Sequence, residues 1–582
     1  MSARKGAKEV RVAAAEAEWT RRDVLRGLVA GSGATLLASL AACGSGENGT
    51  ASEGAREAAS FDAGDVQHIL PSVTHERMRI KVSFGIPRAR APLLSVSGRR
   101  IPGVATDLDR QFFTFDVRGL DPATEYRLQL LEANGARITS EWPLGTFPAP
   151  DADASSLRLL CITCPGGRDE FIDPRNLLRP LQRQFQPMRV KRRILARARA
   201  LSPDALLVNG DHVYWDMRQT TSSLSQGRSP QALLILWTTP FRRDEPVEGN
   251  ANNETAVKKA FGPQIAGFYG VDFRSIPTFF VQDDHDYGDN DEADPHRGTT
   301  FPPDAFQRDL TRFTQKLYYP ELWAPPQLET AFASYLGDGL AQSYGILRYG
   351  RLVEGVIYDW KAHWTDYDLR EDGTEPDGSP DADAKFVPSA IEAWLLDRTT
   401  DGDTVHFFHA PSTPVLWTAG KWAEPYPDVL DEDGNLTMDQ KKPYWPHGWN
   451  LQHDRILNAA SANRRRIPLI LSGDIHSTAL GVINRSNGND YSRNPIVSVL
   501  VGTPGSNLPG FPSTFRGTRA LPSLTLDAVE YVPAIEQNGF SLVDFTQSSI
   551  TVSQFVWDVR TQDESEIDAM EPISVRGFDR PV

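Results

Sequence analysis

Side chains that can bind metal ions follow short apolar segments at six places in this sequence. Each segment has the length and composition of a strand that is buried on both faces. The six are Arg158–Ile162 before Cys164, Ala205–Asn209 before Asp211 and Tyr214, Pro277–Val281 before Asp283–Asp286, Val353–Tyr358 before Asp359, Thr404–Phe408 before His409, and Pro468–Leu471 before Asp474 and His476. Ligands in α/β folds gather at strand ends, because loops there aim side chains without disturbing the core. Six such endings therefore predict one site with several ligands.

The residue types at these endings indicate the chemistry of a metal centre. Carboxylates suit calcium, magnesium or manganese, whereas thiolate, phenolate and imidazole favour iron or zinc. An aspartate shared by two cations about 3.5–4 Å apart would make a site that clamps a phosphoryl group and activates water. A nearby histidine can protonate the leaving oxygen. Taken alone, each residue has a structural alternative: Asp211 could be a helix N-cap, and His409 a hydrogen-bonded core histidine.

The elements that position these residues belong to the segment 157–582, in which the six apolar segments are separated by helical patterns. Ser389-Ala-Ile-Glu392 has the pattern of a capping box and predicts a helix that buries Ile391, Trp394 and Leu395. A second helix is predicted from Asp454 to Arg466, before Pro468. Strands alternating with helices predict the α/β class.

Residues 61–148 have a different pattern, which predicts an all-β domain. Polar and apolar residues alternate in Arg79–Gly85, Phe112–Val117 and Tyr126–Leu131, and turn residues separate these segments. The run from Phe115 to Leu128 resembles the penultimate turn of fibronectin type III and related immunoglobulin-like sandwiches. Residues 148–156 are predicted to link the two domains.

Residues 1–42 have the features of a targeting segment. Arg21-Arg22 forms a twin-arginine pattern, and a weakly apolar run from Gly27 to Ala42 follows it. This pattern predicts export of a folded, metal-loaded protein by the twin-arginine translocase. The alternative is that the segment stays on the mature protein as an amphipathic helix.

Leu40-Ala41-Ala42-Cys43 resembles the lipobox of bacterial lipoproteins. It predicts that Cys43 carries a lipid in a membrane outer leaflet, with residues 43–60 as a flexible tether and a periplasmic or cell-surface location. The alternative is an ordinary signal-peptidase site, with Cys43 incidental.

The sequence contains three cysteines among 582 residues, which excludes a disulfide scaffold. Cys161 and Cys164 have the spacing of a redox pair. However, a redox motif normally opens a helix, whereas Cys161 lies inside an apolar segment and Cys164 just beyond it. We therefore expect a buried Cys161 and a functional Cys164, with an oxidoreductase as an alternative.

The chain is acidic. Residues 1–42 carry seven Lys or Arg and four Asp or Glu, so their removal changes the net charge from −15 to −18. A protein that binds the nucleic-acid backbone needs a basic face, so that class is not expected. An anionic substrate remains compatible, because bound metal ions supply local positive charge.

Several of these motifs together resemble the PhoD-like alkaline phosphatases of the calcineurin-like metallophosphoesterase superfamily. The motifs are Thr163-Cys164, Gly210-Asp211-x-x-Tyr214, Asp283-Asp284-His285-Asp286, Gly473-Asp474-x-His476 and Val501-Gly502-Thr503. The resemblance covers almost all of the chain after residue 42. It implies a four-layer αββα sandwich behind an N-terminal immunoglobulin-like domain, and a centre of iron and calcium, with zinc, manganese or magnesium as alternatives.

The resemblance also assigns individual roles. It implies metal ligands at Cys164, Asp211, Tyr214, Asp284, Asn290, Asp359, His409, Asp474 and His476, and catalytic roles for His285 and Asp211. The chain departs from the family at Asp286, where Glu is usual, so that Asn290 becomes the counterpart of a paired family Asn. It also departs at Trp360-Lys361, where Thr-Arg is common.

The predicted function is an exported, metal-dependent phosphoesterase of the alkaline phosphatase type, with a phosphate ester as substrate. Within the same chemistry, the alternative is a phospholipase D-type or teichoic-acid phosphodiesterase. From another class, the alternative is a metal-loaded surface binding protein without catalysis.

Overall fold

The computed structural model describes residues 61–167, 185–215, 241–288, 303–325, 335–362, 385–419, 447–506, 518–520 and 526–580. All of them belong to one compact unit, Phe61–Val582. The twin-arginine pattern, Cys43, the tether 43–60 and Asn290 lie outside the described residues. No helix within the described ranges is long and apolar enough to cross a membrane.

The first part of the unit consists of eight strands in two antiparallel sheets. One sheet contains β1 (Val66–Val73), β2 (Arg77–Phe84), β6 (Phe112–Arg118) and β5 (Val104–Ala105), and the other contains β4 (Arg99–Pro102), β3 (Leu93–Val96), β7 (Glu125–Leu131) and β8 (Trp142–Gly145). The alternating segments of the sequence correspond to β2, β6 and β7. Their buried residues, such as Ile80, Phe113 and Leu128, share one core.

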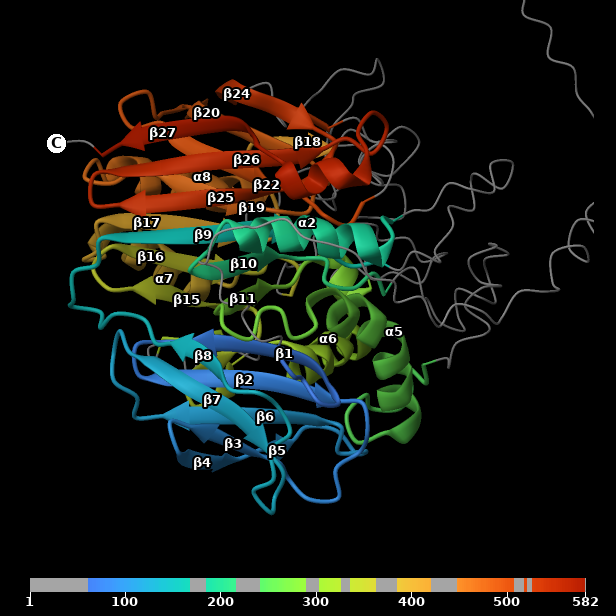
Figure 1. Cartoon of the computed structure of the whole chain (residues 1–582). Coiled ribbons are helices and arrows are strands. Elements are labelled where there is room, and N and C mark those ends of the chain that lie inside the picture. The colour runs from blue at the N-terminus through green and yellow to red at the C-terminus, as the bar shows by residue number, and fades with distance from the viewer. Residues whose placement is uncertain are drawn as a thin grey trace, which may run out of the picture. The chain divides into compact units, whose positions relative to one another are not determined.

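The candidate ligands follow strands of two larger sheets (Figure 1). The six-stranded sheet runs in the order β11 (Thr278–Val281), β10 (Ala205–Asn209), β9 (Ser156–Thr163), β25 (Asn538–Thr546), β26 (Ser549–Trp557) and β27 (Pro572–Asp579). The strands β9, β10 and β11 are parallel, and the others are antiparallel to their neighbours. Parallel strands have their carboxyl ends on the same side of the sheet, so the residues after β9, β10 and β11 lie close together there.

The eight-stranded sheet contains the remaining three segments. Its order is β15 (Tyr344–Tyr349), β16 (Val353–Tyr358), β17 (His406–Pro411), β19 (Leu469–Ser472), β22 (Ile496–Val501), β20 (Thr478–Ser486) and β21 (Asn489–Asp490), with β24 (Asp527–Ile535) also paired to β20. The strands β16, β17, β19 and β22 are parallel. The α/β class predicted for this part of the chain is therefore confirmed.

The other elements are short sheets and helices. The short sheets are β12 (Leu322–Trp323) with β14 (Leu340–Ala341) and β13 (Tyr335–Gly337), and β18 (Trp417–Ala419) with β23 (Thr518–Ala520). The helices are α2 (Met188–Ala200), α5 (Ala251–Tyr269), α6 (Ala305–Tyr318), α7 (Ser389–Asp401) and α8 (His447–Ala462), with 3-10 turns η3 (Asp284–Tyr287) and η6 (Glu564–Ala569).

The two larger sheets pack face to face, and helices cover their outer faces. Leu159 of β9 and Phe408 of β17 share the core between the sheets. Leu160 of β9 instead packs with residues of α2, α5 and α6. Phe407 of β17 packs with residues of α7 and α8. Successive residues of one strand thus enter different cores, as the strand period of two requires.

The predicted capping box of one helix and the predicted bounds of another differ from the structure. The helix α7 does begin at Ser389 and buries Ile391, Trp394 and Leu395, but Pro388 holds the N-cap position and no side chain caps the helix. Ser389 Oγ instead accepts a hydrogen bond from Lys385 Nζ. The helix α8 begins at His447 and ends at Ala462, whereas the sequence predicted Asp454 to Arg466.

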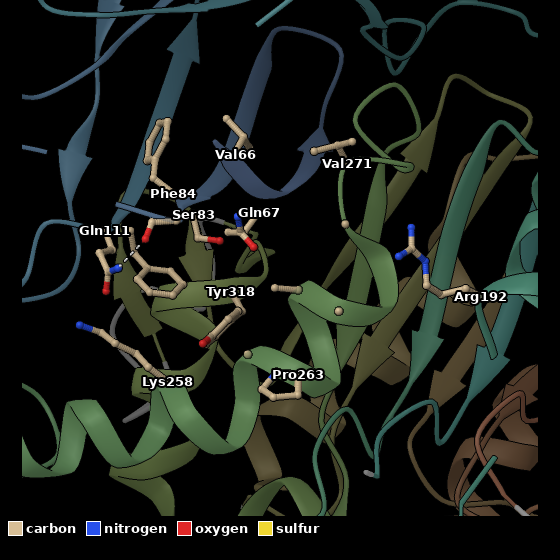
Figure 2. Close-up of a pocket in the computed structure, with 16 residues that line it drawn as sticks. Val66, Gln67, Ser83, Phe84, Gln111, Arg192, Lys258, Pro263, Val271 and Tyr318 are labelled. Carbon is tan, nitrogen blue, oxygen red and sulfur yellow. Dashed lines mark hydrogen bonds between the residues drawn. The ribbon is translucent and has the colours of Figure 1, made fainter. Parts of the chain in front are cut away.

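An open groove of about 800 Å³ lies between the β1–β2–β6 sheet and α5 (Figure 2). Gln67, Ser83 and Lys258 are among its lining residues. Lys258 Nζ is paired with Asp107 and Asp109 at 2.7 and 2.8 Å. No candidate ligand lines the groove, so it is separate from the site predicted at the strand ends.

Candidate metal centre

Three of the strand endings bend sharply at the residue that was predicted to bind metal. Cys164 follows β9, Asp211 follows β10 and Asp474 follows β19, and their φ angles are 49°, 55° and 63°. Left-handed backbone is unfavourable for residues other than glycine and is often found at functional sites. These conformations turn the chain at the sheet edge and bring the three loops together.

The glycines in the two Gly-Asp pairs allow the loops to approach closely. A Cβ on Gly210, whose φ is +74°, would lie 2.4 Å from the Cβ of Asp283. A Cβ on Gly473 would lie 2.3 Å from both the carbonyl oxygen of Asn209 and the Oγ1 of Thr163. Both distances are too short for non-bonded atoms. The Gly-Asp pattern therefore reflects the contact between loops from different strands.

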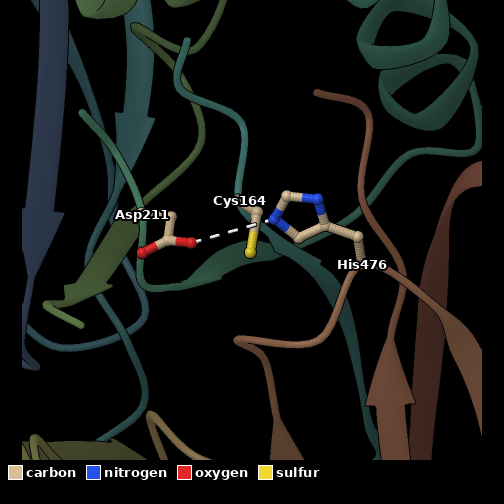
Figure 3. A group of neighbouring side chains, drawn as sticks. All are labelled: Cys164, Asp211 and His476. Atoms are coloured by element: carbon tan, nitrogen blue, oxygen red, sulfur yellow. Dashed lines mark ion pairs between the residues drawn. The ribbon is translucent and has the colours of Figure 1, made fainter. Parts of the chain in front are cut away.

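Cys164, Asp211 and His476 form the first group of candidate ligands (Figure 3). One ligand atom from each lies within 4.8 Å of the others, and all three residues are buried. Tyr214 completes this group: its hydroxyl donates to Asp211 Oδ2 at 3.1 Å and lies 2.8 Å from His476 Nε2. Thiol, imidazole, phenol and carboxylate together match the ligand preferences of iron or zinc.

Two further groups form a chain with the first, in which neighbouring groups share one residue. Asp211, Asp284 and His285 form the second, and Asp283, Asp284 and Asp474 form the third, with the same 4.8 Å limit. Asp211 therefore belongs to groups one and two, and Asp284 to groups two and three. The third group has only carboxylates, which suit calcium or magnesium.

The donors fit bound cations, because several buried carboxylate oxygens accept no hydrogen bond from the described residues. Asp211 Oδ1, both Asp283 oxygens and Asp284 Oδ1 are buried without a hydrogen-bond partner among the described residues. Burial and the neighbouring carboxylates raise the pKa of Asp211 well above its ordinary value, although His285 opposes this shift. Burial likewise raises the pKa of Asp283, which Lys361 Nζ at 3.8 Å offsets in part. Cations bound here would neutralise a charge that the protein leaves largely uncompensated.

Burial also raises the pKa of the Cys164 thiol well above its ordinary value, and the charge of Asp211 adds to the shift. Without a cation the thiol therefore stays protonated. Metal binding would release this proton, because the thiolate is the form that coordinates metal.

His285 lies beside these groups. Its ring packs against the Tyr214 ring with centroids 4.2 Å apart, and its Nε2 is 4.0 Å from Asp284 Oδ2. Only 4% of its surface is exposed. The imidazole is thus held in place next to the predicted metal ligands.

Asp359 lies near the centre but is not in any of the three groups. Its Oδ2 accepts a hydrogen bond from the Tyr287 hydroxyl at 2.6 Å, and its Oδ1 accepts from the backbone N–H of Lys361 at 2.6 Å. Burial raises its pKa to about 7, although these hydrogen bonds oppose the shift. In the structure Asp359 supports η3 through Tyr287.

His409 is not at the end of a strand, as the sequence suggested, because β17 continues to Pro411. The side chain lies on the face of the sheet that α7 covers. Its Nε2 is 3.1 Å from Thr399 Oγ1 of α7, and its Nδ1 is 3.2 Å from the Tyr358 hydroxyl. Burial lowers its pKa to about 3, so the ring is neutral. We therefore leave His409 out of the proposed ligand set.

Sequence reasoning did not assign Asp283 and Asp286 individual roles. Asp283 joins the third group. Asp286 Oδ1 accepts from the backbone N–H of Val213 at 3.1 Å, and its Oδ2 accepts from that of Asp283 at 3.0 Å. It thereby links η3 to the loop after β10, and burial raises its pKa to about 8. The run of acidic residues after β11 was the available signal, but it does not separate a ligand from a structural carboxylate.

No family model and no curated protein matches this chain. Among solved structures, PhoD is similar, with 12% sequence identity over 88% of this chain and 90% of that one, and a TM-score of 0.55. A purple acid phosphatase from yellow lupin (Lupinus luteus) seeds has 12% identity over 88% and 74% of the two chains, with a TM-score of 0.48. A dimetal phosphatase from Danio rerio has 10% identity over 74% and 100%, with a TM-score of 0.32.

The similarity to PhoD, at a TM-score of 0.55 and 12% identity, concerns the fold alone. The chain therefore has a fold similar to that of PhoD, and its strand ends bring together Cys, Asp, Tyr and His side chains suited to metal ions.

Proposed function

We propose that this protein is a metal-dependent phosphoesterase. The observation that carries the proposal is the sharing of Asp211 and Asp284 between neighbouring groups of ligands. A shared carboxylate is what a site needs in order to hold cations a few ångströms apart. The similarity to PhoD supports the proposal at the level of the fold.

The donor sets favour two kinds of cation. Cys164, Asp211 and His476, with Tyr214, would hold iron or zinc, and the carboxylates of Asp283, Asp284 and Asp474 would hold calcium or magnesium. Bound there, the cations would neutralise the phosphoryl oxygens and lower the pKa of the attacking water. We favour iron and calcium, as the family resemblance implies.

We assign His285 the role of general acid for the leaving oxygen. Its imidazole lies beside the carboxylates of Asp211 and Asp284, and its ring packs against that of Tyr214. A histidine that delivers a proton to the leaving alkoxide typically speeds the reaction by about 10²–10⁴-fold. We assign Asp211 the role of the carboxylate that the first two groups share.

The decisive experiment is hydrolysis of an aryl phosphomonoester and the matching diester, with metal content measured in the same samples. We expect hydrolysis that a chelator abolishes and that iron with calcium restores. Asp211→Asn should lose both metal and activity, and Asp454→Asn, which pairs with Ser486 away from the centre, should keep them. Full metal loading without turnover of either ester would contradict the proposal and favour the metal-loaded binding protein.

The same experiment addresses the phosphodiesterase alternative. If only the diester is hydrolysed, phospholipids or teichoic acids become the substrates to test next. We expect hydrolysis of the monoester, as in an alkaline phosphatase.

We also propose that the enzyme acts outside the cytoplasm. The twin-arginine pattern and the small residues before Cys43 support export and a lipid anchor, and the two β-sheets of residues 61–148 support an immunoglobulin-like domain. Cys43→Ser should move the exported protein from the membrane to the soluble fraction. A mature N-terminus at another residue than Cys43 would contradict the anchor.

A further inference from the structure

The segment Pro165–Gly167, which directly follows Cys164, is held by side chains and loops from elsewhere in the chain. The backbone N–H of Gly166 donates to the carbonyl of Asp211 at 2.9 Å. The backbone N–H of Gly167 donates to Gln264 Oε1 of α5 at 2.7 Å. The same Gln264 oxygen accepts from the backbone N–H of Tyr214 at 3.3 Å. The loops that carry Cys164 and Tyr214 therefore share one support.

A further support of this segment is Lys191, in the first turns of α2. Its Nζ donates to the carbonyl oxygens of Pro165 at 3.0 Å and Gly167 at 2.8 Å, and also to that of Gly166. An ammonium has three N–H groups, so three consecutive carbonyls match its capacity. The side chain also lies over the ring of Phe185, 5.4 Å from its centroid.

The position of Lys191 is unfavourable for a lysine in two respects. It has no exposed surface, and the burial of an ammonium requires strong compensation. It also lies near the positive N-terminal end of a helix dipole. Neither the helix dipole nor the apolar surroundings therefore stabilise a charged side chain at this position. The three carbonyl groups stabilise the ammonium by accepting its hydrogen bonds, and they belong to the segment that follows Cys164.

We propose that Lys191 is a positioning residue for the metal centre. It acts through the Pro165–Gly167 carbonyls and holds Cys164 in its left-handed conformation, with the thiol beside Asp211 and His476. A loop held in this way makes the thiol available to the cation without reorganisation, which raises metal affinity. The inference rests on the metal centre of the proposed function.

Cobalt binding to the metal-free full-length protein tests this role, because a thiolate ligand gives cobalt a near-ultraviolet charge-transfer band. Lys191→Met keeps an unbranched side chain, one atom shorter, and removes the charge. We expect it to weaken cobalt binding by about 10–100-fold, the usual effect of losing a support of a ligand, and to reduce the thiolate band. In the metal-free variant, Cys164 should also react faster with a thiol reagent.

Arg192→Met is the matched control. Arg192 is the next residue of α2, its side chain is half exposed, and it pairs with Asp272 rather than with the Cys164 loop. This variant should bind cobalt as the wild type does. Cys164→Ser should lack the thiolate band, which identifies the band with this cysteine.

Lys191→Arg covers the case in which Lys191→Met fails to fold. The guanidinium keeps the charge, but its N–H donors are spread over a planar fork. They therefore cannot reach three neighbouring carbonyls from a single nitrogen, as the ammonium does. We expect a folded protein with cobalt affinity lowered about tenfold. Wild-type affinity and an unchanged band in the folded Lys191 variants would overturn the role of Lys191 alone. A wild-type protein without any thiolate band would instead overturn the metal centre on which the proposed function rests.

Discussion

Two histidines on neighbouring strands show how the interior of a strand differs from its end. The strands β17 and β19 are paired in parallel, and each was predicted to deliver a histidine to the metal centre. His476 follows the end of β19 and reaches Cys164 and Asp211. His409 lies within β17 and is hydrogen-bonded to Thr399 and Tyr358.

The cysteines of β9 repeat this difference within three residues of chain. Cys161 is inside the strand and packs in the core between the two larger sheets. Cys164 is one residue past the strand end and joins the ligand groups. In both pairs, the end of the strand frees a side chain from the alternation that would otherwise place it in a core.

The largest effects are expected for the histidine pair. His476→Ala should lower metal affinity by more than about 100-fold and abolish hydrolysis, because it removes a ligand rather than a supporting residue. His409→Ala should keep its metals and its activity at low temperature while losing about 1–3 kcal/mol of stability, because it removes buried hydrogen bonds. Element analysis and denaturant unfolding of both variants would check this, and metal loss from His409→Ala would break the comparison.

The two cysteines should also differ, with loss of metal and activity only in the variant of the residue beyond the strand end. Cys164→Ala is expected to lose the metal of the first group and most activity, since its thiol is the only sulfur in that group. Cys161→Ala should stay folded and active, at a cost of about 1 kcal/mol for one small buried side chain. Equal losses in the two variants, or activity that responds to thiol oxidation and not to chelation, would favour the redox interpretation.

Variants of His285 and Asp284 extend the comparison to two adjacent residues at one strand end, because they distinguish a catalytic group from a metal ligand. His285→Ala should retain its metals and lose about 10²–10⁴ in kcat for an alkyl phosphate. The loss should be smaller for an aryl phosphate, whose leaving group needs little protonation. Asp284→Asn, one residue earlier, should lose metal instead. An equal fall of kcat on both substrates, or metal loss in His285→Ala, would contradict the role of general acid.

A separate effect concerns the pH dependence of the metal-free protein. Burial raises the pKa of Asp286 to about 8 and that of Asp359 to about 7, from 3.8 in both cases. The folded state therefore binds more protons than the unfolded state between about pH 4 and 8, so stability should fall as pH rises through this window. Thermal unfolding after chelation, at pH 5.5 and 8.5, would measure it.

Added metal is the control for this prediction. Cations that neutralise the neighbouring carboxylates should reduce the pH dependence of Tm. A metal-free protein that is more stable at pH 8.5 than at pH 5.5 would show that these carboxyls are already ionised in the fold.

The sequence by itself determined the strands and the types of ligand. The segment 205–209 coincides with β10 and the segment 353–358 with β16, because short apolar stretches suit strands that are buried on both faces. The residues Cys164, Asp211, Asp474 and His476 could be chosen because each follows such a segment. The Gly-Asp pairs were a further signal of tight turns.

Only the tertiary structure decided which loops meet and which face each side chain takes. His409 could not be excluded from the sequence, because the length of β17 depends on its pairing with β16 and on the cover that α7 provides. Asp283 and Lys191 acquire their contacts from residues that are distant in the chain, such as Asp474 and Pro165. A local pattern specifies an element and its period, whereas the position of a side chain relative to others depends on how whole sheets and helices pack.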